Sequence, residues 1–93
     1  MTVQLPKAAS VSVVIYDNLG TLVTDFSTEI SQEWFRSLPE IVDGRRALLL
    51  QWNLRARGGR NVSAGVYLWK VRVLSVDGDS FETVRRLGVS SIR

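Results

Sequence analysis

Alternating apolar and polar positions dominate two stretches of the chain. In residues 10–17 one face collects β-branched side chains: Val11, Val13 and Ile15. In residues 66–76 one face collects large apolar side chains: Tyr67, Trp69, Val71 and Val73. The opposite face of this second stretch carries Lys70 and Arg72. A period of two with one apolar and one charged face predicts strands of an antiparallel sheet that faces water on one side.

Turn signals separate these stretches from apolar partners. The sequence Asp-Asn-Leu-Gly follows the first stretch at residues 17–20, and Asp77-Gly78 follows the second. Because Asp, Asn and Gly tolerate unusual backbone angles, each cluster predicts a hairpin, with return strands at residues 21–26 and 81–89. Another apolar strand is predicted at residues 46–54, where three large side chains share a face: Leu48, Leu50 and Trp52.

The segment between these strands is ambiguous. Ile30, Trp34 and Leu38 are spaced by four, which places them on one face of a helix and equally on one face of a strand. Pro39 ends the element before it, and Asp43-Gly44 predicts a turn. We favour a strand for residues 30–38, with a short helical turn as the alternative.

About seven short strands with regularly spaced turns predict an all-β fold, an antiparallel β-sandwich. A length of 93 residues suits one domain, so a single Ig-like β-sandwich domain is predicted over residues 1–93. The last strand is a candidate sheet edge, open to main-chain pairing with a partner strand.

The composition excludes several kinds of chemistry. The chain has no cysteine and no histidine, so thiolate catalysis, a zinc site and a Ser-His-Asp triad are excluded within it. Asp77 and Asp79 are close in sequence, but they flank a predicted turn, which accounts for both. We therefore predict no enzyme activity, no metal and no cofactor.

The net charge is +3, and ten of the twelve basic residues are arginine. Three of them lie in a polar, glycine-containing loop: Arg55, Arg57 and Arg60. Such a loop can bind phosphate, but no Gly-Lys-Ser/Thr sequence follows it, and a solvated turn is favoured. A nucleic-acid binder would need these arginines and Arg72 on one face. Acidic residues are spread among the arginines, so nucleic acid is not predicted as a partner.

No apolar run approaches the roughly 20 residues that a membrane helix needs, so no membrane insertion is predicted. The first ten residues lack the charged end and apolar core of a signal peptide. We expect that an export signal, if the domain is exported, lies elsewhere.

The aromatic residues suggest two roles. Tyr67 and Trp69 are expected to fill the space between two sheets, with Trp52 packed against them. Trp34 and Phe35 are adjacent, and we predict this pair as a partner contact, together with the loop arginines. A carbohydrate-binding or other ligand-binding module is the alternative, and it would need Trp34 and another aromatic side chain exposed and coplanar.

Several short motifs carry a family resemblance. They are an Ile-Tyr-Asp-x-x-Gly hairpin, an apolar strand ending in Trp, a glycine-containing polar loop and a Val-x-Ala-Gly-x-Tyr strand. In this chain the motifs fall at residues 15–20, 48–52, 55–60 and 62–67. Residues 11–89 thereby resemble the Ig-like (fibronectin-III-like) module of flagellar hook-capping proteins of the FlgD type. They are similar also to sorting domains at the C-termini of type-nine-secreted proteins.

The resemblance implies a role as well as a fold. Modules of this kind occur near the C-termini of bacterial secreted and surface proteins. The implied function is that of a non-catalytic accessory module, which serves as a spacer, an assembly contact or a sorting element. The implied partners are other domains of the parent protein or another protein, and the implied location is extracellular or at the cell surface.

Overall fold

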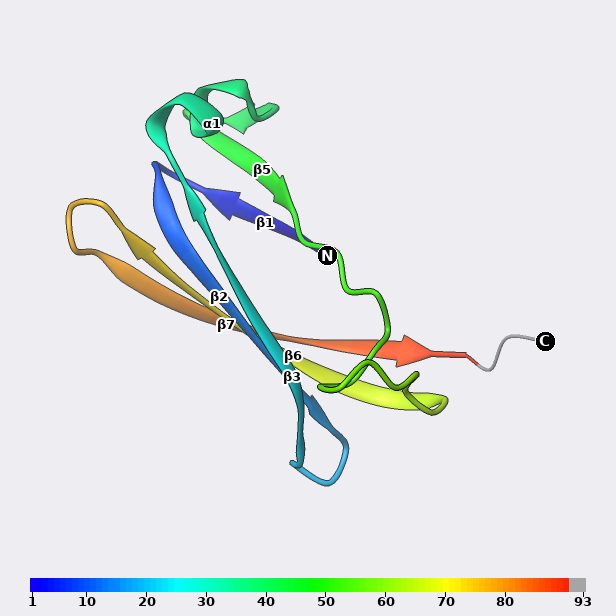
Figure 1. Cartoon of the computed structure of the whole chain (residues 1–93). Helices are drawn as coiled ribbons and strands as arrows, with labels where there is room; N and C mark the ends of the chain where they lie inside the picture. Colours follow the sequence, from blue (N-terminus) through cyan, green and yellow to red (C-terminus); the bar gives the residue numbers. More distant parts are fainter. Residues whose placement is uncertain (91–93) are drawn as a thin grey trace.

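The computed structural model describes residues 1–90, over which the chain forms seven strands and one helix. The strands make two antiparallel sheets, one of four strands and one of three, which face each other (Figure 1). The predicted all-β sandwich of about seven strands is thereby confirmed. The last three residues of the predicted domain, 91–93, lie outside the described residues.

The larger sheet is built from the two predicted hairpins. Its strand order is β3 (Leu22–Ile30), β2 (Ala9–Asp17), β6 (Gly65–Ser75) and β7 (Ser80–Val89). β2 and β6 form the centre, and β3 and β7 form the two edges. The predicted edge position of the last strand is confirmed.

The smaller sheet has the order β1 (Thr2–Leu5), β5 (Arg45–Leu49) and β4 (Glu40–Val42). β1 was not among the predicted strands, because only its alternate residues Val3 and Leu5 are apolar enough to signal it. Both are buried, and Val3 pairs with Leu48 across the sheet. The predicted turn at residues 43–44 joins β4 to β5, and both of its residues have positive φ, as a two-residue hairpin requires.

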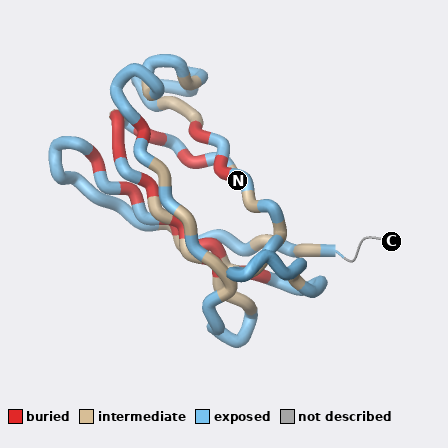
Figure 2. The backbone as a smooth tube through the Cα atoms, in the orientation of Figure 1, coloured by how far each residue is buried: buried red, intermediate tan, exposed pale blue. Residues whose placement is uncertain are grey.

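The core lies between the two sheets, where the buried positions of β1, β2 and β6 line up (Figure 2). The alternation predicted for β2 and β6 holds at every second residue. The core side chains from these two strands are Val11, Val13, Ile15, Tyr67, Trp69, Val71 and Val73. At about 25 cal/mol per Å² of apolar surface, this layer is the main stabilising contribution to the domain.

The favoured strand at residues 30–38 is wrong, and the alternative helical turn is correct. The structure has a helix, α1 (Gln32–Ser37), after β3 ends at Ile30. Ser31 caps the helix, since its Oγ accepts a hydrogen bond of 3.1 Å from the backbone N–H of Trp34. The polar cap, with Glu33 in the first turn and Arg36 in the last, favours the helix where the apolar spacing is ambiguous. At the other end, Arg46 donates a hydrogen bond of 2.7 Å to the carbonyl of Leu38.

The predicted strand at residues 46–54 is shorter in the structure, because β5 ends at Leu49. Leu50 remains buried and its N–H donates to the carbonyl of Met1 at 2.7 Å. Beyond it the chain leaves the sheet and runs as a loop to Gly65. Trp52 therefore sits on a loop and not on a strand, which changes what its side chain faces.

Candidate functional site

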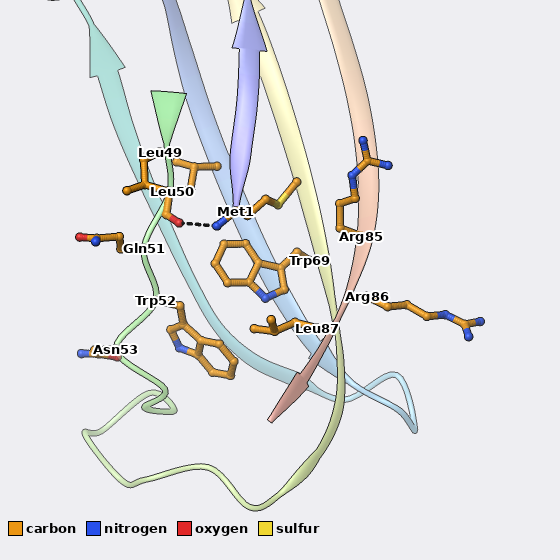
Figure 3. Close-up of a pocket in the computed structure, with 10 residues that line it drawn as sticks. All are labelled: Met1, Leu49, Leu50, Gln51, Trp52, Asn53, Trp69, Arg85, Arg86 and Leu87. Atoms are coloured by element: carbon orange, nitrogen blue, oxygen red, sulfur yellow. Dashed lines mark hydrogen bonds between the residues drawn. The ribbon is translucent and has the colours of Figure 1, made fainter. Parts of the chain in front are cut away.

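A hollow of the described surface lies at the open side of the sandwich, where the loop after β5 faces β7 (Figure 3). Its volume is about 820 Å³. We call it the indole cleft. Its lining residues come from the start of β1, the end of β5, the following loop, β6 and β7: Met1, Leu49, Leu50, Gln51, Trp52, Asn53, Trp69, Arg85, Arg86 and Leu87.

An aromatic cluster forms the inner wall of the cleft. The Trp52 ring lies edge-to-face against Tyr67 at 5.4 Å and against Trp69 at 6.1 Å between centroids. Phe26 of β3 also lies edge-to-face against Trp69, at 6.3 Å between centroids. Tyr67 and Trp69 are 7% and 3% exposed. The predicted packing of these three rings is confirmed, and two of them also line the cleft.

The polar atoms of the three rings differ in their hydrogen bonds. Trp52 Nε1 donates to the carbonyl of Arg55 at 3.0 Å, and the Tyr67 hydroxyl donates to the carbonyl of Ser63 at 2.6 Å. Trp69 Nε1 is buried and has no hydrogen-bond partner among residues 1–90. In Figure 3 this nitrogen lies on the side of the ring that faces Leu87 in the cleft. A buried N–H without a partner costs about 1–3 kcal/mol.

The cleft exists because the smaller sheet covers only part of the larger one. The pairing with β6 places alternate residues of β7 on the inner face, among them Phe81, Thr83, Arg85 and Leu87. These lie opposite core residues of β6, yet Phe81 is still 39% exposed. A second hollow of about 670 Å³ lies between β1 and β7, and it shares Met1 and Arg85 with the indole cleft. Together they follow the inner face of β7.

The charge of the cleft is positive. Arg85 forms no ion pair within the described part of the chain. Glu82, the acidic residue of β7, lies on the opposite face of that strand, where Lys70 and Arg72 contact it at 3.7 and 3.1 Å. Glu82 also contributes to the lining of the second hollow, but the ion pairs of residues 1–90 join it to Lys70 and Arg72 and not to Arg85.

The predicted arginine loop lies elsewhere. Arg57 forms an ion pair of 2.7 Å with Asp25, and its N–H donates to the carbonyl of Val23 at 3.0 Å. Arg55 donates to the carbonyl of Gly59 within the loop at 2.9 Å. Arg60 lines a separate hollow near the start of β3. Two of the three arginines thus hold the loop to itself and to β3, and none of the three lines the indole cleft.

The predicted pair on α1 is split between two environments. Trp34 is 43% exposed, whereas Phe35 packs against the core below the Arg46 guanidinium, 5.5 Å from its ring centroid. No ring of residues 1–90 stacks against Trp34, and the ring pairs that the structure contains are edge-to-face. The coplanar platform that a carbohydrate-binding module would need at Trp34 is therefore not formed. The role of both residues as a partner contact stays a prediction.

Sequence reasoning missed the indole cleft. Its signals were present, since Arg85 interrupts an otherwise uncharged set of alternate positions in β7 and Trp52 ends an apolar run. The missing information was how far the smaller sheet extends over the larger one.

Two further properties bear on function. The structure described for residues 1–90 holds no group of three or more acidic residues that could bind a metal ion. Within the same residues the single helix, α1, is too short to cross a membrane.

Solved structures supply the comparison with known proteins. CopC from Methylosinus trichosporium OB3b is 24% identical with a TM-score of 0.51, over 94% of this chain and 72% of that one. FlgD from P. aeruginosa is 20% identical with a TM-score of 0.57, over 95% of this chain and 62% of that one. The chain thus spans less than two thirds of the FlgD chain. No protein-family model and no curated protein matches the sequence. The two structural matches show that the chain has an Ig-like β-sandwich fold of the type found in FlgD.

Proposed function

We propose that this chain is a non-catalytic accessory module of a larger bacterial secreted or cell-surface protein. It acts as a spacer, an assembly contact or a sorting element, and its contacts are with other domains or with a protein partner. The observation that carries the proposal is the exposed edge strand β7 (Ser80–Val89), which pairs with β6 alone among the described strands.

The two edge strands of the larger sheet differ in how far other parts of the chain cover them. At β3 the loop after β5 covers one end, through the contacts of Arg57 with Val23 and Asp25. No described strand covers the outer edge of β7. A long unpaired edge is a template for pairing with another chain, and proteins that do not use such an edge usually shorten or cover it. β7 is therefore the preferred contact.

The disposition of the acidic side chains supports a non-catalytic role. Asp17 accepts hydrogen bonds of 2.9 Å from the N–H groups of Leu19 and Thr21 and so fixes the β2–β3 turn. Asp25, Asp77 and Glu82 are taken up in ion pairs. General acid–base catalysis needs titratable groups that converge on one substrate position, and these carboxylates are spread over turns and strand faces.

The proposed extracellular or surface location rests on the resemblance to modules of secreted proteins. Only the fold is shared with FlgD at 20% identity, and fold alone does not carry function. The location therefore needs its own test.

An antibody raised against this chain gives that test. Cultured cells of the source bacterium are separated into cytosolic, envelope and medium fractions, and each fraction is immunoblotted. We expect one band with an apparent mass above that of a 93-residue chain, enriched in the envelope fraction or the medium fraction. A band of the size of this chain that stays with a cytosolic marker would refute the proposal. Limited proteolysis that releases a resistant fragment would show that the module folds independently.

A further inference from the structure

We infer that the indole cleft and the inner face of β7 bind an extended, acidic peptide segment. The inference rests on the proposed contact role and names the chemistry of the partner. It is built from four features of the cleft: its apolar floor, its buried donor, its charge and its shape.

The floor supplies apolar contact. In Figure 3 the Trp52 and Leu87 side chains lie close to each other on one side of Trp69, and Met1 lies on its other side. Trp52 and Leu87 are only partly buried, although both pack against the core. An apolar side chain of a bound segment would remove this remaining surface from water. Aromatic side chains that are partly exposed in a hollow are typical anchors of protein interfaces.

The second feature is a buried hydrogen-bond donor, the Nε1–H group of Trp69. Trp69 is buried, with only 3% of its surface exposed to solvent. Its Nε1 has no acceptor among the described residues and points toward Leu87. A buried donor is almost always paired in a folded protein. A carbonyl or carboxylate oxygen that enters beside Leu87 would supply the acceptor.

The charge selects an acidic occupant. Arg85 lies on the inner face of β7 and has no ion-pair partner in residues 1–90. Arg45 lies beside the same strand, in the second hollow. An arginine guanidinium can bind a carboxylate through two parallel hydrogen bonds. A basic segment would be repelled by the same two residues.

The shape selects an extended segment over a compact ligand. The two hollows share Arg85 and follow β7 from Phe81 to Leu87. A strand of about seven residues rises about 23 Å and matches this length. It would lie beside the unpaired edge of β7, where main-chain hydrogen bonds are open to it. Alternation then presents every second side chain of the segment to the cleft.

An exposed arginine outside the cleft provides a matched test. Arg60 lines a separate hollow near the start of β3, whereas Arg85 lines both the indole cleft and the second hollow. Arg85→Glu and Arg60→Glu change the net charge by the same amount. Only the first places a carboxylate inside the cleft. Both residues are exposed, so both variants are expected to fold, which circular dichroism verifies.

The experiment measures the fluorescence anisotropy of a labelled peptide of about seven residues, in which one set of alternate positions carries valine and glutamate in turn and the other set carries serine. The peptide is titrated with the whole chain at physiological salt. We expect saturable binding that Arg85→Glu weakens about tenfold or more, whereas Arg60→Glu changes it less than about threefold. Trp69→Phe removes the buried donor and is expected to weaken binding about threefold or more. A control peptide with lysine in place of glutamate should not bind.

Several results would overturn the inference. They are no saturable binding of the acidic peptide, equal binding of the lysine peptide, or equal effects of the two arginine variants. Sedimentation that shows a dimer, abolished by Arg85→Glu and not by Arg60→Glu, would assign the cleft to a second copy of this chain. If the peptide fails to bind while the chain still fractionates within a larger surface protein, the accessory role stands and only the acidic partner is refuted.

Discussion

The two tryptophans of the cleft offer the sharpest test of the packing. Trp52 and Trp69 contact each other edge-to-face at 6.1 Å, yet only Trp52 Nε1 has an acceptor, the carbonyl of Arg55 at 3.0 Å. Trp52→Phe and Trp69→Phe make the same chemical change. Trp52→Phe loses a hydrogen bond, whereas Trp69→Phe removes a buried N–H group that has no acceptor.

The expected magnitudes follow from the environment of each ring. An indole exceeds a phenyl ring by on the order of 50 Å² of apolar surface, which is about 1 kcal/mol at 25 cal/mol per Å². At the buried Trp69 this loss is offset by removing an N–H whose burial costs about 1–3 kcal/mol. Trp69→Phe should therefore leave the free energy of unfolding unchanged or raise it by up to about 2 kcal/mol.

At Trp52 the two effects have the same sign. The ring is half-buried, so about half of the transfer free energy is lost. The lost hydrogen bond adds about 0.5–1.5 kcal/mol. Trp52→Phe should therefore destabilise the domain by about 1–2 kcal/mol, a noticeable share of the 5–14 kcal/mol or so expected for a domain of this size.

Urea unfolding followed by far-ultraviolet circular dichroism measures both variants without relying on tryptophan emission. Equal m-values justify comparing the unfolding midpoints directly. The reasoning would be refuted if Trp69→Phe were the more destabilising variant by 1 kcal/mol or so. That result would mean that cavity formation around the phenyl ring outweighs the relief of the unpaired N–H.

Three further predictions concern turns, caps and surface charge. Gly78 has a φ of +94° in the β6–β7 turn, so Gly78→Ala should cost about 1 kcal/mol in urea unfolding. Ser31→Ala removes the cap of α1 and should cost about 1 kcal/mol, with a loss of helical ellipticity. Lys7 donates to Asp77, which lowers the pKa of Asp77 and raises that of Lys7. This stabilisation is lost as the pH falls below about 4 or rises above about 10.4, so the melting temperatures of wild type and Asp77→Asn should converge at both extremes.

Each of these predictions has its own control. Gly88→Ala provides the comparison for the turn, because Gly88 has no positive φ and open space around its Cα; equal costs at both glycines would contradict the backbone argument. Ser31→Thr should retain the cap, and a loss equal to that of Ser31→Ala would contradict it. A constant difference in melting temperature between pH 3 and pH 7 would show that the Lys7–Asp77 pair contributes no stability.

Much of the fold follows from local pattern. The alternation in residues 10–17 and 66–76 identifies both the strands and their buried faces, because side chains of a strand point to opposite sides in turn. The Asp-Gly turns are equally local, since few other residues accept their backbone angles. Even the packing of Trp52 against Tyr67 and Trp69 follows from the number of large rings that a small core has to bury.

Other elements depend on contacts between distant residues. Residues 30–38 carry a spacing that suits helix and strand alike, and the cap at Ser31 with the bond from Arg46 to Leu38 decides between them. β1 carries a weak signal of its own, and it forms because β5 offers it a register that buries Val3 and Leu5. Neither outcome can be derived from a window of a few residues.

The candidate site also depends on contacts between residues that are distant in the sequence. The sequence determined that β7 is a strand with a charged residue, Arg85, among its alternate positions. Only the tertiary structure decided that a three-stranded sheet would lie over a four-stranded one and leave that face of β7 uncovered. The physical reason is that strand faces are set by the period of the local sequence, whereas the extent of one sheet over another is set by the packing of residues far apart in the chain.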